Sequence, residues 1–109
     1  MRRLLSDYHA KEPIAFRDIV EFHWRFECIH PFQDGNGRVG RLIMFKECLA
    51  NGIMPLIIDH ENKLFYYRGL KEFAAEKGYL TDTCLSAQDA YEALFKHFAL
   101  LQTDLPMSE

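Results

Sequence analysis

Apolar residues recur at helical spacing along most of the chain, and this pattern predicts an all-α fold. Residues 1–10 resemble the end of a helix that Pro13 prevents from continuing. A second helix is expected over residues 14–29. The residues that set its apolar spacing are Ile19, Phe22, Phe26 and Ile29.

The segment 38–50 is apolar on nearly every side, which is typical of a buried central helix. Asn51 and Gly52 supply a C-terminal stop. A short extended segment, 53–58, follows and contains Pro55. The apolar residues of the predicted central helix are Val39, Leu42, Ile43, Met44, Phe45 and Leu49.

Two further helices are predicted in the second half of the chain. The first covers residues 62–77 and ends at Gly78, and the second follows an N-terminal cap at Ser86–Asp89. No alternating strand pattern reaches a convincing length, so we expect a helical bundle with irregular loops at 30–37 and 53–61. The apolar stripe of the last helix consists of Ala90, Leu94, Phe95, Phe98 and Leu101.

The composition is typical of a single globular domain. With 109 residues, 49% of them hydrophobic and 27% charged, the chain is long enough for one core and too apolar to be disordered. Its net charge of −3 argues against a nucleic-acid partner. The longest apolar runs are too short to cross a bilayer and no secretory leader is recognisable, so neither a membrane nor secretion is indicated.

The cysteines point to a reducing environment. Cys28, Cys48 and Cys84 form an odd set that lacks the short Cys/His spacings of a structural zinc site. We therefore expect three reduced and mostly buried thiols, which fits a cytoplasmic protein.

One stretch, HPFQDGNGRVGR at residues 30–41, combines glycines, charges and a histidine between two apolar segments. It precedes a predicted helix, whose free backbone N–H groups and positive dipole end attract anions. Gly35, Gly37 and Gly40 carry no side chain, so phosphate oxygens have access to the backbone. This is not a Walker loop, because no Gly-Lys-Ser/Thr sequence occurs.

The charged residues of this stretch suit phosphate chemistry. Arg38 and Arg41 are three positions apart, hence on one helix face, where two guanidinium groups can clamp a polyphosphate. Asp34 is a hard oxygen ligand of the kind that holds Mg²⁺ beside phosphates, and His30 can act as a general base near neutral pH. Together they indicate phosphoryl or nucleotidyl transfer. Taken one by one, the same residues also fit a helix cap, a turn and a solvated arginine face.

As a whole, the stretch 30–41 closely resembles the signature of the Fic domain family, His-Pro-Phe-x-Asp/Glu-Gly-Asn-Gly-Arg-x-x-Arg, and meets every specified position. The resemblance extends to VEFHWRFECIHPF before it and to FYYRGL after it, and covers residues 5–100. It implies an all-helical bundle in which an anion-binding loop joins two central helices. It also implies transfer of AMP from ATP to a Ser, Thr or Tyr hydroxyl of a target protein.

The resemblance gives each motif residue a role by position. His30 would take the proton from the acceptor hydroxyl, Phe32 would anchor the loop in the core, and Asp34 would hold Mg²⁺ between the α- and β-phosphates. The backbone of Gly35 and Gly37 would line the anion site. The remaining contacts would come from Asn36 on the α-phosphate, Arg38 on the β-phosphate and Arg41 on the terminal phosphates.

The resemblance also implies an adenine side on the later helix, formed by Tyr66, Tyr67 and Leu70. The alternative is that these residues only pack in the core. His23 lies seven residues before His30, and we interpret it as a histidine of the core or one that supports the site, not as a catalytic residue.

Two family features are missing from these residues. No Ser/Thr-x-x-x-Glu-Gly/Asn run occurs, so an inhibitory glutamate would have to come from a partner protein or an upstream segment. The β-hairpin flap that positions the target in the family would lie upstream of the motif, where this chain reads as helix. We therefore expect residues 1–109 to be a single Fic-like catalytic core of a longer protein or of a trimmed natural form. A homodimer would cover the part of the core that a missing N-terminal helix leaves exposed.

Three functions stay open at this point. The first is a protein adenylyltransferase that uses ATP and Mg²⁺. The second is transfer of another group. A kinase-like branch of the family typically carries a lysine where this chain has Gly37, which disfavours transfer of the γ-phosphate. Transfer from UTP or from a phosphocholine carrier is compatible with the motif. The third is a nucleotide-binding module without transfer activity.

Overall fold

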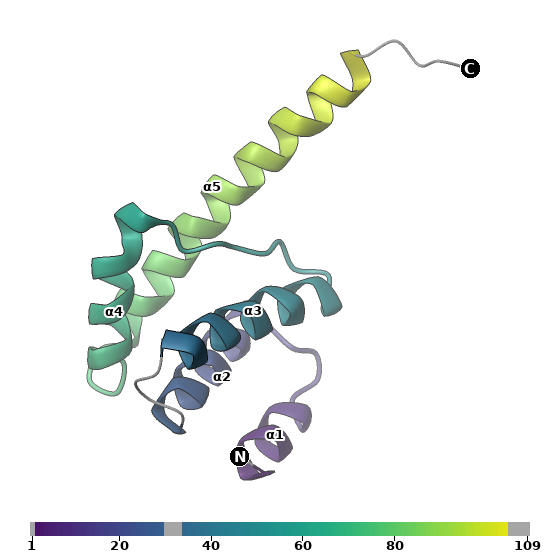
Figure 1. Ribbon diagram of the computed structural model, residues 1–109. Helices are drawn as coiled ribbons and strands as arrows, with labels where there is room; N and C mark the ends of the chain where they lie inside the picture. Colours follow the sequence, from purple (N-terminus) through teal and green to yellow (C-terminus); the bar gives the residue numbers. More distant parts are fainter. Residues whose placement is uncertain (1, 30–33, 105–109) are drawn as a thin grey trace.

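The computed structural model describes residues 2–29 and 34–104 of the chain. Within these ranges the chain is mainly helical and has no strand, which confirms the predicted all-α fold (Figure 1). None of the helices in this described part combines the length and apolarity that crossing a membrane requires. The helices are α1 (Arg2–His9), α2 (Phe16–Ile29), α3 (Asp34–Ala50), α4 (Lys63–Glu72) and α5 (Lys77–Asp104), with a 3₁₀ turn (His60–Asn62) before α4.

Helix α2 packs against both α1 and α3, and these three helices form one half of the molecule (Figure 1). Tyr8 of α1 is buried, and its ring packs against Phe22 of α2 with centroids 4.5 Å apart. The Tyr8 hydroxyl donates a hydrogen bond to Glu47 of α3 over 2.8 Å. Because α1 is too short to be stable by itself, these contacts hold it in place.

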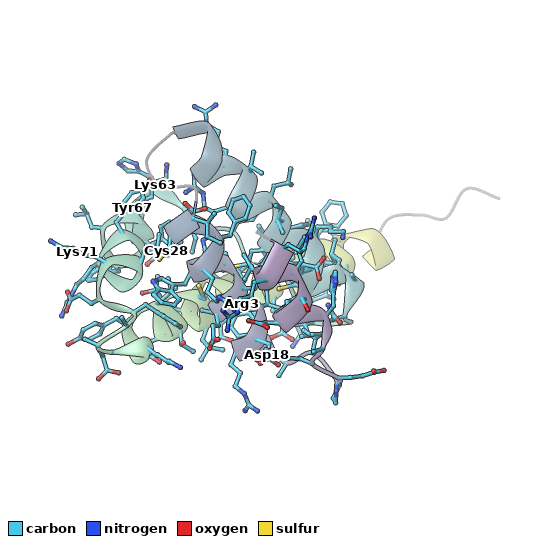
Figure 2. The ribbon with its side chains drawn as sticks, turned by 90° about the horizontal axis from the view of Figure 1, so that it is seen from below. Arg3, Asp18, Cys28, Lys63, Tyr67 and Lys71 are labelled. Carbon is cyan, nitrogen blue, oxygen red and sulfur yellow. The ribbon has the colours of Figure 1, made fainter. Side chains whose placement is uncertain are left out.

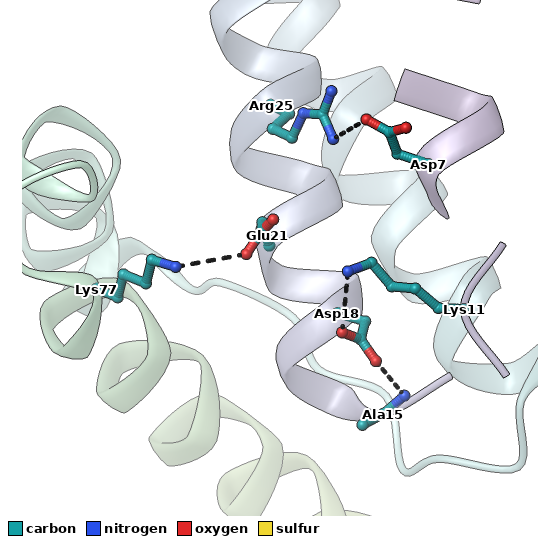
Figure 3. A network of polar contacts seen from close by, with 7 residues as sticks. All are labelled: Asp7, Lys11, Ala15, Asp18, Glu21, Arg25 and Lys77. Atoms are coloured by element: carbon teal, nitrogen blue, oxygen red, sulfur yellow. Dashed lines mark hydrogen bonds and ion pairs between the residues drawn. The ribbon is translucent and has the colours of Figure 1, made fainter. Parts of the chain in front are cut away.

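Polar contacts at the start of α2 and along its outer face join the surrounding segments (Figure 3). The Asp18 carboxylate accepts a hydrogen bond from the Ala15 amide over 2.8 Å, which satisfies an N–H group at the entrance to the helix. The ion pairs are partly exposed to solvent, so each contributes at most about 1 kcal/mol. They are Arg25–Asp7 (3.2 Å), Lys11–Asp18 (3.7 Å) and Lys77–Glu21 (3.7 Å).

Helices α4 and α5 form a hairpin in which the two backbones come very close. A Cβ atom on Gly69 would lie 2.6 Å from the Leu80 Cα atom, so this approach requires glycine. The helix predicted over 62–77 is confirmed for residues 63–72, but its predicted end is wrong, because the chain reverses after Glu72 and Gly78 lies in the first turn of α5. Packing of the hairpin overrides the helix propensity of the residues in the turn.

The predicted N-terminal cap at Ser86–Asp89 is also wrong, because α5 continues through it. Leu80, Cys84 and Ala87 are buried at helical spacing across this point, so tertiary packing favours one continuous helix. Toward its C-terminus α5 extends beyond the other helices (Figure 1), and its apolar stripe faces solvent. The exposed fractions are 67% for Leu94, 55% for Phe95, 59% for Phe98 and 50% for Leu101.

Helix α3 begins at Asp34, one turn before the predicted range 38–50, and it is not buried on all sides. Met44 and Cys48 are buried, but α2 packs along one side of α3 and covers only that side. The predicted burial is therefore wrong for the residues that face away. Their exposed fractions are 47% for Val39, 67% for Leu42 and 58% for Leu49.

The connection from α3 to α4 is an extended segment that crosses the molecule (Figure 1). Gly52 has a φ of 67° and follows the end of α3, as predicted. Residues 53–59 have no regular structure, which agrees with the expected extended segment. The Gln88 side chain of α5 donates a hydrogen bond to the Met54 carbonyl over 2.7 Å and fixes the segment against α5.

The core lies where α2, α3 and the α4–α5 hairpin meet. Trp24 of α2 packs against Phe73 at the end of α4, with ring centroids 4.7 Å apart, and so joins the two halves of the molecule. The cysteines are free thiols, of which Cys48 and Cys84 are buried and Cys28 is exposed.

We expect Gly69→Ala to destabilise the fold by about 1–3 kcal/mol, because the added methyl group overlaps the Leu80 backbone. The matched control is Gly78→Ala, where the methyl group meets only the flexible end of the Glu76 side chain at 3.0 Å. For the control we expect a change within about 1 kcal/mol. Urea denaturation followed by circular dichroism measures both, and equal midpoints would contradict the close packing of the hairpin.

Candidate functional site

The second half of the motif forms the first turn of α3. The backbone of residues 34–37 supplies the N–H groups at the helix N-terminus, which have no acceptor within the helix. The predicted loop 30–37 is therefore helical from residue 34 onward. His30 and Phe32 lie outside the described residues, and their roles stay predictions.

Arg38 and Arg41 lie on one face of α3, as their spacing predicts. Arg38 is exposed and Arg41 is half-buried, and both border a cavity of about 380 Å³ between α3 and the segment 56–58. Two guanidinium groups beside an otherwise apolar lining suit a ligand that carries negative charge next to an apolar group. The other lining residues are Leu42, Met44, Phe45, Leu56, Ile57 and Ile58.

The Arg41 side chain points back along α3 toward the start of the helix. A Cβ atom on Gly37 would lie 3.3 Å from the Arg41 Nη1 atom, so the guanidinium lies beside this motif glycine. It also lies over the Tyr66 ring, 5.6 Å from the centroid, within the range of a cation–π interaction. Burial lowers the pKa of Arg41, but interactions with the Tyr66 and Tyr67 hydroxyls outweigh it, so the net pKa is raised.

Tyr66 and Tyr67 of α4 have opposite environments. Tyr66 is 0% exposed, so its ring has no surface for a nucleotide base, which argues against the predicted adenine contact for this residue. Tyr67 is 50% exposed and Leu70 packs at the edge of the core, so the adenine-side prediction is retained for these two. Figure 2 shows Tyr67 on an outward face of α4, together with Lys63 and Lys71.

His23 is buried where α2, α3 and α4 meet. Its Nδ1 atom lies 3.2 Å from the Gly40 carbonyl oxygen, and its Nε2 atom lies 2.5 Å from the Tyr66 hydroxyl. Because a carbonyl oxygen only accepts, this network assigns the proton to Nδ1 and makes Nε2 the acceptor for the tyrosine. Burial lowers the pKa of His23 to about 4, so the ring is neutral at pH 7. The interpretation of His23 as a core histidine is confirmed.

Glu27 of α2 lies against the start of α3 and was not expected at the site. Its Oε2 atom is buried without a hydrogen-bond partner and occupies the space that a Cβ atom on Gly40 would need. Burial raises the pKa of Glu27, and the charge of Arg41 opposes this effect. The sequence signal for Glu27 is weak: it is one acidic residue in a largely apolar segment, three positions before His30.

The predicted metal site depends on Asp34. Among the side chains that the structure describes, no group of three or more His, Cys, Asp and Glu residues gathers as a protein-only metal site would require. Mg²⁺ needs only one or two carboxylates when substrate phosphates and water complete its shell. Asp34 is the first residue of α3, but its side chain lies outside the described part of the structure, so its role as a Mg²⁺ ligand stays a prediction.

Known proteins share sequence with most of this chain. Residues 1–48 match the model of the Fic/DOC family. A probable protein adenylyltransferase of Aquifex aeolicus is 44% identical over 59 residues, which are 54% of this chain and 17% of that protein. The protein adenylyltransferase Fic of Drosophila melanogaster is 33% identical over 106 residues, which are 95% of this chain and 21% of the relative. The chain thus spans about a fifth of the length of the curated relatives it matches.

The buried neutral His23 makes the fold sensitive to acid. Histidine has an ordinary pKa of 6.5, whereas burial lowers the pKa of His23 to about 4, so between these values the unfolded chain binds the additional proton. This contribution to stability is complete above pH 6.5 and is lost as the pH falls toward 4. The difference corresponds to about 3 kcal/mol in the free energy of unfolding.

His23→Gln removes this titration, so urea denaturation between pH 7 and 4 should show a shallower loss of stability than in the wild type. His97→Gln, which removes an exposed imidazole from α5, is the matched control. Parallel pH profiles for wild type and His23→Gln would contradict a buried neutral histidine.

Proposed function

Because this chain belongs to the Fic/DOC family, we propose that it is a protein adenylyltransferase, which transfers AMP from ATP to a Ser, Thr or Tyr hydroxyl of a target protein. The observation that carries the proposal is the placement of Arg38 and Arg41 on one face at the start of α3, beside a cavity. In-line displacement at phosphorus depends on positioning and charge neutralisation more than on covalent help, and this site offers both. The names of the relatives support AMP as the transferred group.

In this reaction the acceptor oxygen attacks the α-phosphorus of ATP. The bond between that phosphorus and the oxygen bridging to the β-phosphate breaks, pyrophosphate leaves with the bridging oxygen, and AMP remains on the target. The hydroxyl proton passes to His30, since imidazole titrates near neutral pH and suits a general base.

The motif residues divide the contacts to the triphosphate. Gly35 and Gly37 present backbone N–H groups to the phosphate oxygens, and Asn36 binds the α-phosphate. Arg38 binds the β-phosphate and Arg41 the terminal phosphates. The position of the Arg41 guanidinium beside Gly37 supports this arrangement, because it brings the positive charge to the helix start.

Asp34 is the residue that would hold Mg²⁺, which would supply positive charge to offset the negative charge of the triphosphate. Phe32 lies outside the described residues and keeps the anchoring role that the family motif implies for it. On α4, Tyr67 and Leu70 contact the adenine. The half-exposed ring of Tyr67 supports this role, because a base can stack on an aromatic face that solvent reaches.

The cavity beside the two arginines also suits inhibition. A glutamate delivered there by a partner protein, or by another segment of a longer chain, would pair with Arg41 and compete with the phosphates of ATP. Leu42 and Phe45 in the lining suit the apolar side of a helix that carries such a glutamate. The free thiols support a cytoplasmic protein, which is where ATP and target proteins are available.

We expect label from ATP to reach protein in a manner that depends on His30. The chain is incubated with Mg²⁺ and ATP labelled at the α-phosphate, alone and with cell lysate, beside His30→Ala. Wild type should transfer the α-label and His30→Ala should not, because the acceptor hydroxyl then lacks its base. Label that arrives only from γ-labelled ATP would replace the proposal with a kinase reaction. Binding of ATP without any transfer would leave a nucleotide-binding module.

We expect Arg38→Ala to weaken ATP binding by about 1.5–3 kcal/mol, the scale of a charge-assisted hydrogen bond. Arg25→Ala is the matched control, since Arg25 pairs with Asp7 of α1 and does not border the cavity of Arg38. Titration calorimetry with Mg²⁺ and ATP measures both variants. Equal affinity in Arg38→Ala and Arg25→Ala would show that Arg38 does not contact the phosphates.

A further inference from the structure

A network of polar contacts joins three helices around one peptide unit of α3. It begins at the Gly40 carbonyl of α3 and passes to His23 of α2 over 3.2 Å. It continues to the Tyr66 hydroxyl of α4 over 2.5 Å. From Tyr66 it returns to α3 at Arg41, the residue next to Gly40, whose guanidinium lies over the Tyr66 ring, 5.6 Å from its centroid. The network therefore begins and ends at two neighbouring residues of the motif, Gly40 and Arg41.

One arrangement of protons satisfies every member of this network. The Gly40 carbonyl accepts from Nδ1 of His23, so Nε2 carries no proton and accepts from the Tyr66 hydroxyl. The remaining lone pairs of the tyrosine oxygen are then available to the guanidinium of Arg41, which only donates. Each link thus fixes the orientation of the next, from the backbone of α3 to its arginine.

Arg41 also has a competing partner. The Glu27 carboxylate interacts with Arg41 through its charge, and its Oε2 atom has no hydrogen bond to satisfy it. Glu27 lies against Gly40, whereas the guanidinium of Arg41 lies beside Gly37, one turn nearer the helix start. A guanidinium drawn to Glu27 would therefore move away from the N-terminus of α3.

We propose that Tyr66 and His23 are positioning residues, which hold the Arg41 guanidinium beside Gly37, where the polyphosphate binds. Tyr66 acts on the guanidinium directly, and His23 acts by fixing the direction of the Tyr66 hydroxyl. This inference rests on the proposed function of Arg41 as a polyphosphate ligand. It assigns the buried Tyr66 to phosphate binding, whereas the exposed ring of Tyr67, whose hydroxyl also interacts with Arg41, is proposed for the adenine side.

The test compares Tyr66→Phe with Tyr8→Phe. Each variant removes one hydroxyl from a buried tyrosine, and the Tyr8 hydroxyl bonds Glu47 near the opposite end of α3. Affinities for inorganic tripolyphosphate and for adenosine are measured separately by calorimetry. We expect Tyr66→Phe to weaken tripolyphosphate binding about tenfold and to leave adenosine binding unchanged. Tyr8→Phe should change neither affinity, although it also loses a hydrogen bond.

A second pair of variants tests His23. His23→Asn keeps a donor for the Gly40 carbonyl but is too short to reach Tyr66, whereas His23→Gln places an amide oxygen near the position of Nε2. His23→Asn should reproduce the loss of tripolyphosphate affinity seen in Tyr66→Phe, and His23→Gln should retain more of it. The reverse order would overturn the role of His23.

Arg41→Ala separates this inference from the proposed function. If Arg41→Ala binds tripolyphosphate as tightly as wild type, Arg41 is not a phosphate ligand and the proposed clamp fails. If Arg41→Ala binds weakly while Tyr66→Phe matches Tyr8→Phe, only the positioning role fails. In the Arg41→Ala background, Tyr66→Phe should cause no further loss, because Tyr66 acts through Arg41. An equal loss in both backgrounds would overturn the inference.

Discussion

A buried imidazole has two nitrogens to satisfy, and His23 satisfies them on two different helices. His23 belongs to α2. It donates a hydrogen bond to a carbonyl of α3 and accepts one from a hydroxyl of α4. Apolar burial supplies most of the stability of such a core but leaves helices some freedom to slide and rotate. The directional bonds of His23 remove that freedom at the second turn of the motif helix.

In the proposed function the chemistry of the site depends on this arrangement, because the motif by itself does not hold the Arg41 guanidinium in position. A helix N-terminus attracts many anions, and glycines only open access to it. Discrimination in favour of a polyphosphate comes from guanidinium groups held at defined positions. Tyr66, the residue that we propose to hold Arg41, comes from α4, far along the chain, and its hydroxyl bonds His23 of α2. On this proposal the motif and the hairpin form one functional unit, although 25 residues, 42–66, lead from one to the other.

The sequence predicted those features that depend on local order. Helical spacing located α2, and the ordered motif identified the arginine pair. The errors at 62–77 and at Ser86 have one cause: the packing of α4 on α5 overrides local cap and stop signals. The link between His23 and Tyr66 joins residues 43 positions apart, and no local pattern reports it. The predicted burial of α3 was wrong for the same reason, because periodicity shows which residues share a helix face but not whether another element covers that face.

The contact between Trp24 and Phe73 has a practical consequence. Trp24 is the single tryptophan of the chain, and it lies where the α4–α5 hairpin meets the helix that leads into the motif. Its indole emission therefore comes from this junction alone. The protein carries an intrinsic fluorophore at the joint between its two halves, so their docking can be followed optically, in real time and without an attached dye.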